Sequence, residues 1–457
     1  MQNDPMSAPP LLGGPQRVLG AWSAVAVVVG MVVGAGIFRT SPLVAQSLGG
    51  EGEVLLAWAL GGIFALIGAL CYAELAAAFA DAGGDYRFLR EAFGRDLAYL
   101  FAWSRFSVIF SASAAMLAFV GADYLAQIVP MNGAARAAVA AVAVGLLTAL
   151  NLRGVRTGAR AQVALVTLDV AALLALGAAA LLLIALEVPP RLPGAGTTAP
   201  GGFGQAMVFV MLAYGGFNDA STLSAEVRHP REMTRALFGG MSAVTALYLL
   251  ANWAYLRGLG FAGLAASDAP AAELMWLAFG KTGETMIVIG VAVATFAVLN
   301  ALIIVGGRTL YAAAEDEPAL ARLAEWDQSR GVPRAAILAQ TAFALGLIIW
   351  GATTGRGFAT MVDYLSPVYW SFLTLSGLAV IVLRQSQPGA VRPYKVPLYP
   401  LLPLMFAGGS AYVLYSSVLY VGWQGCLISF GVLGFGLILR LILRWMFAIG
   451  AQAETAA

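Results

Sequence analysis

Twelve long apolar stretches recur along this 457-residue chain, and they constrain its fold more than any other feature. Hydrophobic residues make up 60% of the sequence and charged residues only 11%, which lies outside the range of water-soluble globular domains. A helix needs about 20 apolar residues to cross the hydrocarbon core of a bilayer, and each stretch is compatible with that requirement. The sequence therefore predicts an all-α membrane protein with 12 transmembrane helices.

The predicted spans group into two units of five, with two helices left over. A cytoplasmic N-terminal tail is expected at 1–16, the first five-helix repeat at 17–186 and the second at 203–383. Helices 11 and 12 are expected at 399–447, followed by a cytoplasmic C-terminal tail at 448–457. Because five is an odd number, the second unit starts on the opposite side of the membrane and runs inverted. We therefore expect a 5+5 inverted repeat with two peripheral helices.

The basic residues predict an orientation. If the N-terminus is cytoplasmic, the inside segments hold 19 Lys and Arg residues and the outside segments hold 6. This asymmetry follows the positive-inside rule and places both termini in the cytoplasm of a multi-pass cell (inner) membrane protein. The polar N-terminal tail does not resemble a cleavable signal peptide. The net charge of +2 gives no reason to expect a nucleic acid partner.

Glycine interrupts the first and sixth spans at matching places, 181 residues apart from Gly34 to Gly215. The two segments are GMVVGAGIFRTSP at 30–42 and FVMLAYGGFNDAS at 209–221. One such motif alone favours close helix packing through small residues. Two at equivalent positions favour unwound backbone, which hydrocarbon tolerates only where protein or a water-filled cavity satisfies the amides. The pair of breaks therefore predicts a central binding cavity in a transporter.

The broken helices present opposite partial charges to this cavity. The amides of Ala35, Gly36 and Ile37 would open a half-helix, and a helix N-terminus suits a carboxylate. The carbonyls near Tyr214 and Gly215 would end another half-helix, and those oxygens suit an ammonium group. Together they predict a receptor for a zwitterion, which means an α-amino acid held mainly by backbone atoms.

The chain resembles the amino acid, polyamine and organocation (APC) superfamily, and within it the L-type amino acid transporters. Four segments carry the likeness: VGAGIFRTSP, YAELAAAFADAGGDYRFLREAFG, AYGGFNDASTLSAEVRHPRE and RPYKVPLYPLLP. The resemblance implies the leucine-transporter fold, with helices 1 and 6 broken, and transport by alternating access.

The resemblance also implies roles for individual residues. The amides of Ala35 and Gly36 would take the substrate carboxylate, and the carbonyls of Val32 and Gly215 the amino group. Asn218 would border the side-chain pocket. At one position the chain departs from the family, because Leu212 stands where an aromatic gate is usual. The predicted substrate-binding set is Val32, Val33, Gly34, Ala35, Gly36, Ile37, Leu212, Tyr214, Gly215 and Asn218.

A second departure is Asp169 in the fifth span, where the resemblance implies a lysine whose ammonium substitutes for a sodium ion. Asp169 follows Arg160 by nine residues, about 14 Å along a helix, which places it near the middle of the membrane. A buried carboxylate there is a candidate proton acceptor or cation ligand. Alternatively, it forms a structural ion pair with Arg105, which lies at comparable depth. Both interpretations fit the sequence.

The sequence offers little for other chemistry. His229 is the only histidine, and Cys71 and Cys426 lie within predicted spans, so we expect no metal, no cofactor and no enzyme activity. No disulfide-linked heavy subunit is expected, since the loop between spans three and four has no cysteine. The expected partners are an amino acid substrate and the lipid bilayer. Our leading prediction is a transporter of neutral L-amino acids, by exchange or proton-coupled uptake; the alternatives are a cationic amino acid or polyamine transporter and a non-transporting paralogue.

Overall fold

A computed structural model of the chain describes residues 21–34, 36–79, 84–153, 159–191, 202–221, 227, 230–315, 317, 320–327 and 329–456. Within these ranges the regular structure is helical and no strand occurs; the residues in isolated bridges are Val227 and the pair Asp327 and Val332. The prediction of an all-α protein is therefore confirmed for this part of the chain.

The first half of the chain contains both broken and continuous helices, including one short π-helix, η1, where the helical turn is wider than in an α-helix. The elements are α1 (Ala21–Val32), α2 (Gly36–Gln46), α3 (Glu51–Ala78), α4 (Asp85–Phe93), α5 (Arg95–Ser104), η1 (Arg105–Phe110), α6 (Ser111–Leu125), α7 (Gly133–Leu152) and α8 (Ala159–Ala185).

The second half begins with a short helix and continues with longer ones, three of which turn at a glycine within their length. The elements are α9 (Gly202–Tyr214), α10 (Pro230–Ala266), α11 (Pro270–Glu315), α12 (Arg334–Thr354), α13 (Gly357–Ser386) and α14 (Leu401–Ala456).

Many of these helices are suited to a membrane. Among the described residues, 9 helices are long and apolar enough to cross a bilayer, or 10 if the bent pair α1 and α2 counts as one span. Two of the twelve predicted spans are not counted among these 10. The 13-residue α9 is shorter than a full span, and α14 covers predicted helices 11 and 12 with a turn at Gly422. The membrane fold is confirmed, while the twelve-span inverted repeat stays a prediction.

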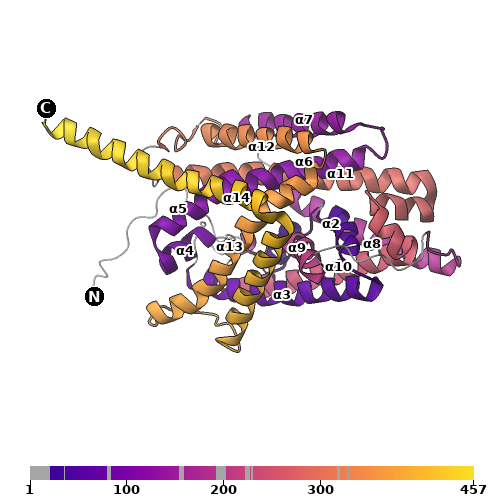
Figure 1. The fold of residues 1–457 in the computed structure, drawn as a ribbon. Helices are drawn as coiled ribbons and strands as arrows, with labels where there is room; N and C mark the ends of the chain where they lie inside the picture. Colours follow the sequence, from indigo (N-terminus) through magenta and orange to yellow (C-terminus); the bar gives the residue numbers. More distant parts are fainter. Residues whose placement is uncertain are drawn as a thin grey trace.

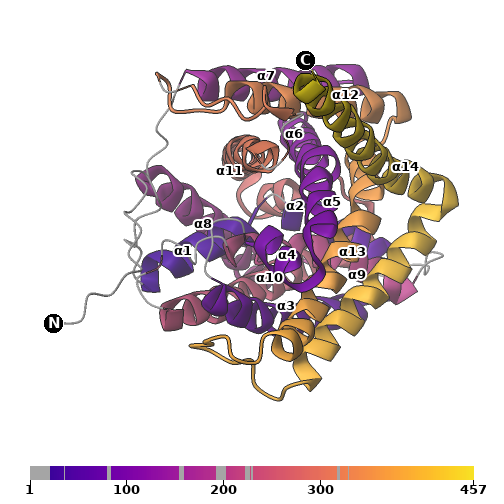
Figure 2. The same cartoon turned by 90° about the vertical axis from the view of Figure 1, so that its left-hand side faces the viewer.

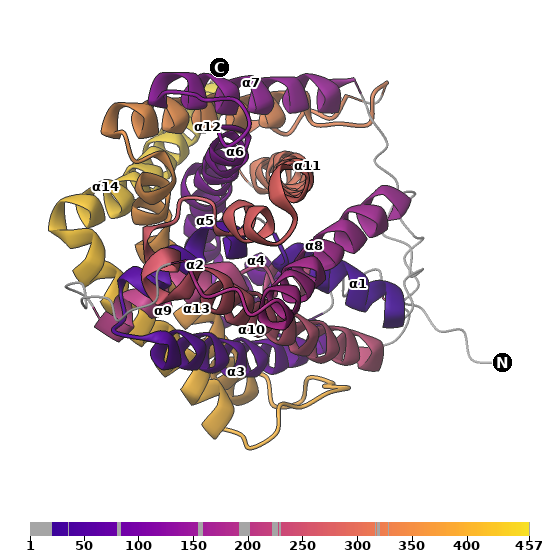
Figure 3. The ribbon, with the colours of Figure 1, turned by 90° about the vertical axis from the view of Figure 1, so that its right-hand side faces the viewer.

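The broken helices lie in the centre of the bundle. In Figure 1, α2 and α9 lie side by side between α3 and α10 on one side and α6 and α11 on the other. Figure 2 shows α7 and α12 paired outside α6 and α11, with α14 along another outer edge. Figure 3 shows α8 beside α1, α10 and α11. The outer α14 exposes large apolar side chains, as expected where lipid covers a helix: Trp423, Leu427, Phe435 and Trp445.

Candidate functional site

The first glycine break separates α1 from α2. Helix α1 ends at Val32, α2 begins at Gly36, and the two helices differ in direction by 47°. The Val33 amide still donates to the Val29 carbonyl at 2.7 Å, so the last turn of α1 is closed before the chain bends. Ala35, one of the predicted carboxylate-binding residues, lies outside the described residues. The break is therefore confirmed, whereas carboxylate binding at it stays a prediction.

The second break follows α9, which ends at Tyr214. Turns occupy 215–218, and a short 3₁₀ segment follows at 219–221. The Gly215 amide donates to the Leu212 carbonyl at 3.2 Å, and Gly216 adopts a φ of 104°, where a residue with a Cβ is strained. Glycine thus permits the chain to leave the helix here, as the sequence predicts.

The two breaks contact each other directly. A Cβ atom on Gly216 would collide with the carbonyl oxygen of Met31 at the end of α1. A Cβ atom on Gly36 would lie 3.4 Å from the Cα atom of Ala213 near the end of α9. Close approach of the two backbones therefore requires the absence of side chains at these glycines. Unwound segments from the two predicted repeats meet at one place in the bundle.

Tyr248 on α10 connects the ends of the two half-helices. Its hydroxyl lies 2.9 Å from the Val32 carbonyl oxygen and 3.1 Å from the Ala213 carbonyl oxygen, and its side chain is buried. Sequence reasoning did not single out Tyr248. The signal in the sequence that could have identified Tyr248 is a tyrosine within an apolar span. A buried hydroxyl usually finds a hydrogen-bond partner, so such a tyrosine indicates a polar contact inside the bundle. The Val32 carbonyl, predicted to bind the substrate amino group, is engaged by this hydroxyl.

The side chain of Tyr214 points toward α3 rather than into the break. Its hydroxyl donates to the Trp58 carbonyl at 3.0 Å, and its ring centroid lies 5.8 Å from that of Trp58 and 5.1 Å from that of Tyr248. The Tyr214 side chain therefore lies away from the break. The role that the sequence predicts for this residue falls to its backbone carbonyl. The rings of Trp58, Tyr214 and Tyr248 pack together as a buried aromatic cluster beside the two breaks.

A charged cluster lies immediately beyond the second break. The Arg105 Nη2 atom is 2.5 Å from Asp219 Oδ1, and Arg105 Nη1 is 3.9 Å from Asp85 Oδ2. The Asn218 amide nitrogen donates to Asp85 Oδ2 at 3.2 Å, and the Tyr369 hydroxyl donates to Asn218 Oδ1 at 3.1 Å. This cluster of Arg105, Asp85, Asp219, Asn218 and Tyr369 joins η1, α4 and α13 to the segment after α9.

Two of the charged groups of this cluster, Arg105 and Asp85, are held away from water, whereas the Asp219 side chain is 29% exposed. Arg105 is 6% exposed, and its guanidinium carbon lies 4.3 Å from the centroid of the Phe110 ring, a distance suited to a cation–π contact. Burial raises the pKa of Asp85 to about 6, although the nearby Arg105 guanidinium opposes this rise. The cluster lines a cavity of about 10 Å³, room for roughly one water molecule. In this conformation the region is closed to an amino acid.

The predicted ion pair between Asp169 and Arg105 is wrong. Arg105 pairs with Asp219 and Asp85 instead, and no ion pair of the described residues includes Asp169. Equal depth in the membrane does not place two side chains on facing sides of their helices. Asp169 is 4% exposed, and its helix α8 packs against α1, α10 and α11.

The remaining predicted residues surround the breaks. Val33 and Ile37 are fully buried, Leu212 is half-buried, and a Cβ atom on Gly34 would contact Val298 of α11 at 3.8 Å. The described residues contain no group of His, Cys, Asp and Glu side chains with an arrangement that could hold a metal ion.

Comparison with known proteins gives a consistent set of similarities. A family model described as amino acid permease matches residues 19–438. The b(0,+)-type amino acid transporter 1 of Mus musculus is 28% identical over 403 residues, which cover 85% of this chain and 81% of the relative. The serine/threonine exchanger SteT of Bacillus subtilis (strain 168) is 27% identical over 416 residues, covering 89% and 92%. The large neutral amino acids transporter small subunit 2 of Homo sapiens is 28% identical over 410 residues, covering 86% and 74%.

Proposed function

Because the chain belongs to the amino acid permease family, we propose that it is a secondary transporter of neutral L-amino acids across the cell membrane. The observation that carries this proposal is the direct contact between the two helix breaks, which brings unwound backbone from α1, α2 and α9 to one place. In this proposal the amides at the start of α2 bind the carboxylate, and carbonyls at the ends of α1 and α9 bind the ammonium group. Twelve spans in a 5+5 inverted repeat, with both termini cytoplasmic, complete the arrangement.

A preference for neutral substrates is supported by the charged cluster. Asp219, the carboxylate nearest the second break, is already paired with Arg105 at 2.5 Å. It is therefore less available to a cationic substrate than the sequence alone suggests. The alternative of a cationic amino acid or polyamine transporter has one observation in its favour, because two carboxylates, Asp85 and Asp219, lie beside the second break. Competition of labelled leucine uptake by arginine, putrescine and alanine separates the two functions.

Ion pairs at both ends of the site support alternating access. Under the proposed orientation, the Arg105 and Asp219 pair lies on the cytoplasmic side of the breaks. On the other side, Arg39 of α2 donates to Asp268, between α10 and α11, at 2.9 Å. Opening the site toward either side requires one of these contacts to separate while the other persists. The cluster around Arg105 is thus our candidate for the cytoplasmic closure.

Asp169 is our candidate for proton coupling. It is buried in the membrane, no ion pair of the described residues neutralises it, and its helix α8 packs against α1, which ends at the first break, and α10, which carries Tyr248. A carboxylate in such a place favours its protonated form. In proteoliposomes with an imposed pH gradient, Asp169→Asn should abolish gradient-driven accumulation but retain exchange. Accumulation equal to that of the wild type would remove Asp169 from the coupling mechanism.

The decisive assay is uptake of a labelled amino acid mixture into proteoliposomes. Sodium, proton and internal amino acid gradients applied in turn distinguish symport from exchange. Substrate binding without uptake under any gradient would indicate the alternative of a non-transporting paralogue.

A further inference from the structure

Glu74, near the end of α3, is a buried carboxylate that is enclosed by donors. It is 2% exposed, and the Arg384 guanidinium donates to it through Nε at 2.7 Å and Nη2 at 2.5 Å. The Val396 amide donates to Oε2 at 2.7 Å, and the Arg392 Nε atom lies 3.5 Å from Oε1. A guanidinium fork on a carboxylate is a strong and directional contact, because both groups are charged and planar. Glu74 is therefore held from three directions, at a place separate from the charged cluster around Arg105.

All of these donors come from one stretch of chain, residues 384–399, which we call the strap. The strap begins in the last turn of α13, and the Arg392 guanidinium returns to that turn, because its Nη2 atom donates to the Leu383 carbonyl at 2.8 Å. The guanidinium carbon of Arg384 lies 4.0 Å from the ring centroid of Tyr399. The strap is thus closed on itself around the carboxylate, and it joins the end of α13 to α3.

Phe406 continues this attachment into the beginning of α14. Its buried ring has its centroid 5.4 Å from that of Phe64 and 6.2 Å from that of Tyr72, both on α3. A Cβ atom on Gly68 of α3 would lie 2.6 Å from the Phe406 ring, so the absence of a side chain there admits the ring. The Phe406 centroid is also 6.2 Å from that of Phe217, which follows the second break. The start of α14 is therefore packed on α3 beside that break.

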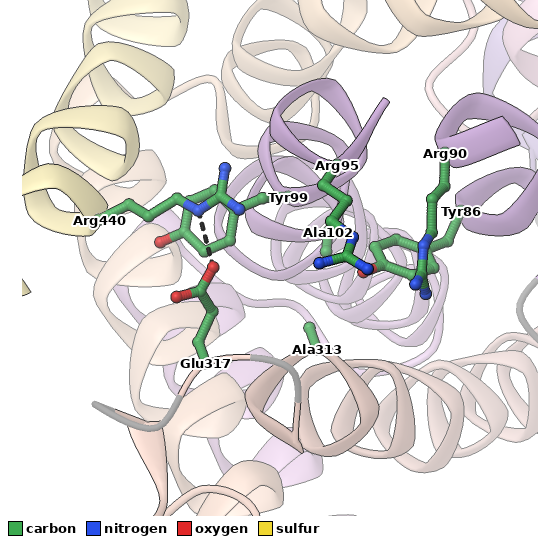
Figure 4. Close-up of a pocket in the computed structure, with 8 residues that line it drawn as sticks. All are labelled: Tyr86, Arg90, Arg95, Tyr99, Ala102, Ala313, Glu317 and Arg440. Atoms are coloured by element: carbon green, nitrogen blue, oxygen red, sulfur yellow. Dashed lines mark hydrogen bonds and ion pairs between the residues drawn. The ribbon is translucent and has the colours of Figure 1, made fainter. Parts of the chain in front are cut away.

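The other ends of α13 and α14 are attached to α5 and its continuation η1. On α13, the Tyr364 hydroxyl donates to the Ser107 carbonyl at 3.2 Å. On α14, the guanidinium carbon of Arg440 lies 4.4 Å from the ring centroid of Tyr99 on α5 (Figure 4). The Arg440 Nη1 atom also donates to Asp96 of α5 at 2.6 Å. Each of the two helices therefore bridges the α3 side and the α5 side of the bundle.

Both bridging helices contain a residue that permits bending between their two attachments. Helix α13 contains Pro367, which has no amide N–H to donate within the helix and therefore allows a kink. Helix α14 turns at Gly422, where φ is 74°. Each helix can therefore bend while the contacts at its two ends persist.

Contacts of the strap and of α13 with α4 and α5 restrain movement less than the contact with Glu74. Gln387 donates to Glu91 of α4 at 3.0 Å, and the Glu91 side chain is 25% exposed and already part of an ion pair. The ring centroids of Phe372 on α13 and Phe101 on α5 are 5.1 Å apart, and an apolar contact of this kind has little directionality. The buried fork on Glu74 is therefore the stronger attachment of this part of the chain.

We propose that Glu74 is a positioning residue for transport, which fixes the strap and the cytoplasmic end of α13 to α3. When the cytoplasmic side opens, these elements move as one body with α3 and away from α5, while α13 bends at Pro367. Because Phe406 and Tyr72 both contact Phe217, this motion reaches the second break directly. The inference rests on alternating access and on the orientation given under the proposed function.

Electron–electron double resonance on the full-length purified protein measures this movement. Spin labels are attached at Ser386→Cys, at the end of α13, and at either Ala78→Cys on α3 or Arg95→Cys on α5. Cys426 is replaced by Ser, and the buried Cys71 is retained. Distances are measured without amino acid and with a saturating mixture of neutral amino acids.

The two label pairs give opposite expectations. The distance from Ser386 to Arg95 should change at least about threefold more than the distance from Ser386 to Ala78. A larger change in the distance to Ala78 would overturn the proposal, because the end of α13 would then move with α5. No change in either distance while labelled amino acid is bound would overturn it as well.

Exchange kinetics in proteoliposomes distinguish positioning from a purely structural role. Glu74→Gln retains the size of the side chain but loses the charge, so the maximal exchange rate should fall about tenfold while KM changes by less than about twofold. The matched control is Glu91→Gln, which removes a carboxylate that accepts from the strap only at Gln387 among the described residues, and it should exchange as the wild type does. Equal rates for Glu74→Gln and the wild type would overturn the proposal. If Glu74→Gln does not fold, Arg384→Lys, which retains the charge but not the fork, should give a smaller fall.

Failure of the proposed function would give a different result. If the wild type neither binds nor exchanges amino acids, the distance from Ser386 to Ala78 still tests the attachment of the strap. Its distribution should become about twofold broader in Glu74→Gln, because the strap is no longer held, and should stay unchanged in Glu91→Gln. Equal widths in the two variants would show that Glu74 does not fix the strap.

Discussion

The Tyr248 hydroxyl lies 2.9 Å from the carbonyl oxygen of Val32, and so α10 is hydrogen-bonded to the end of the first half-helix. The same hydroxyl is 3.1 Å from the Ala213 carbonyl oxygen at the second break. A hydroxyl has one proton, so it can fully satisfy only one of the two carbonyls at a time. The other carbonyl keeps acceptor capacity for a substrate ammonium group, which links the packing of the breaks to their proposed function.

Replacing Tyr248 tests this link. We expect Tyr248→Phe to lower the free energy of unfolding by about 1–3 kcal/mol, because two buried carbonyls lose their shared donor. The measurement is thermal or denaturant unfolding of the purified protein. Tyr255→Phe is the matched control on the same helix, since Tyr255 is equally buried and its hydroxyl has no hydrogen-bond partner among the described residues. Equal destabilisation by the two variants would show that the bridge has no special role.

The pair formed by Arg105 and Asp219 should be strongly coupled. In a double-mutant cycle with Arg105→Gln and Asp219→Asn, we expect a coupling energy of about 1–2 kcal/mol, because Arg105 is buried whereas the Asp219 side chain is 29% exposed. The pair of Lys281 and Glu284, at 2.9 Å and with a lysine side chain that is 65% exposed, serves as the control and should give less than about 1 kcal/mol. Additive effects of the Arg105 and Asp219 changes would contradict the proposed closure.

Asp85 should make stability depend on pH. Its pKa is raised by burial from 3.8 to about 6, so the folded protein holds this proton more tightly than the unfolded chain does. The stability that the protonated group contributes is therefore lost as the pH rises from about 4 to about 6, a change of about 3 kcal/mol. Unfolding of the wild type and of Asp85→Asn across this range measures the effect. The free energy of unfolding of Asp85→Asn should decrease less over this range than that of the wild type. Identical pH profiles for the two proteins would argue against a raised pKa of Asp85.

The close contact of the breaks should require glycine at position 216. Gly216→Ala places a methyl group against the Met31 carbonyl oxygen at a φ of 104°, so the two breaks must move apart. We expect substrate affinity to fall by about tenfold, the equivalent of one lost charge-assisted hydrogen bond. Gly239→Ala is the control, because its Cβ would meet only Val25 at 3.8 Å. Binding of a labelled amino acid to the purified variants gives the comparison.

The sequence predicts the breaks well because glycine in an apolar span is a local signal. The positions of Gly34, Gly36 and Gly215 alone indicate where helices α1 and α9 end, and the structure places those ends together. The fold class follows for a similar reason, since hydropathy reports each span independently of its neighbours. Helix count is less secure, because α14 combines two predicted spans in one helix with a turn.

Contacts between distant helices could not be predicted in this way. Depth along a helix is readable from sequence, but the direction of a side chain around the helix axis depends on packing. Arg105 therefore received the wrong partner, and neither Asp85 nor Tyr248 was identified as part of the site. The sequence shows an acidic residue, Asp85, directly after the two glycines of the AGGDY segment. Its position beside Asn218, however, depends on how α4 packs in the bundle, which the sequence does not indicate.

The central claim is that the two breaks form one amino acid site. It is tested most directly by uptake of a labelled amino acid mixture into proteoliposomes containing the wild type, Gly216→Ala or Gly239→Ala, with an internal amino acid pool. The account predicts rapid exchange by the wild type and Gly239→Ala and strongly reduced exchange by Gly216→Ala. Equal exchange by all three proteins, or no entry of any amino acid with the wild type, would contradict it.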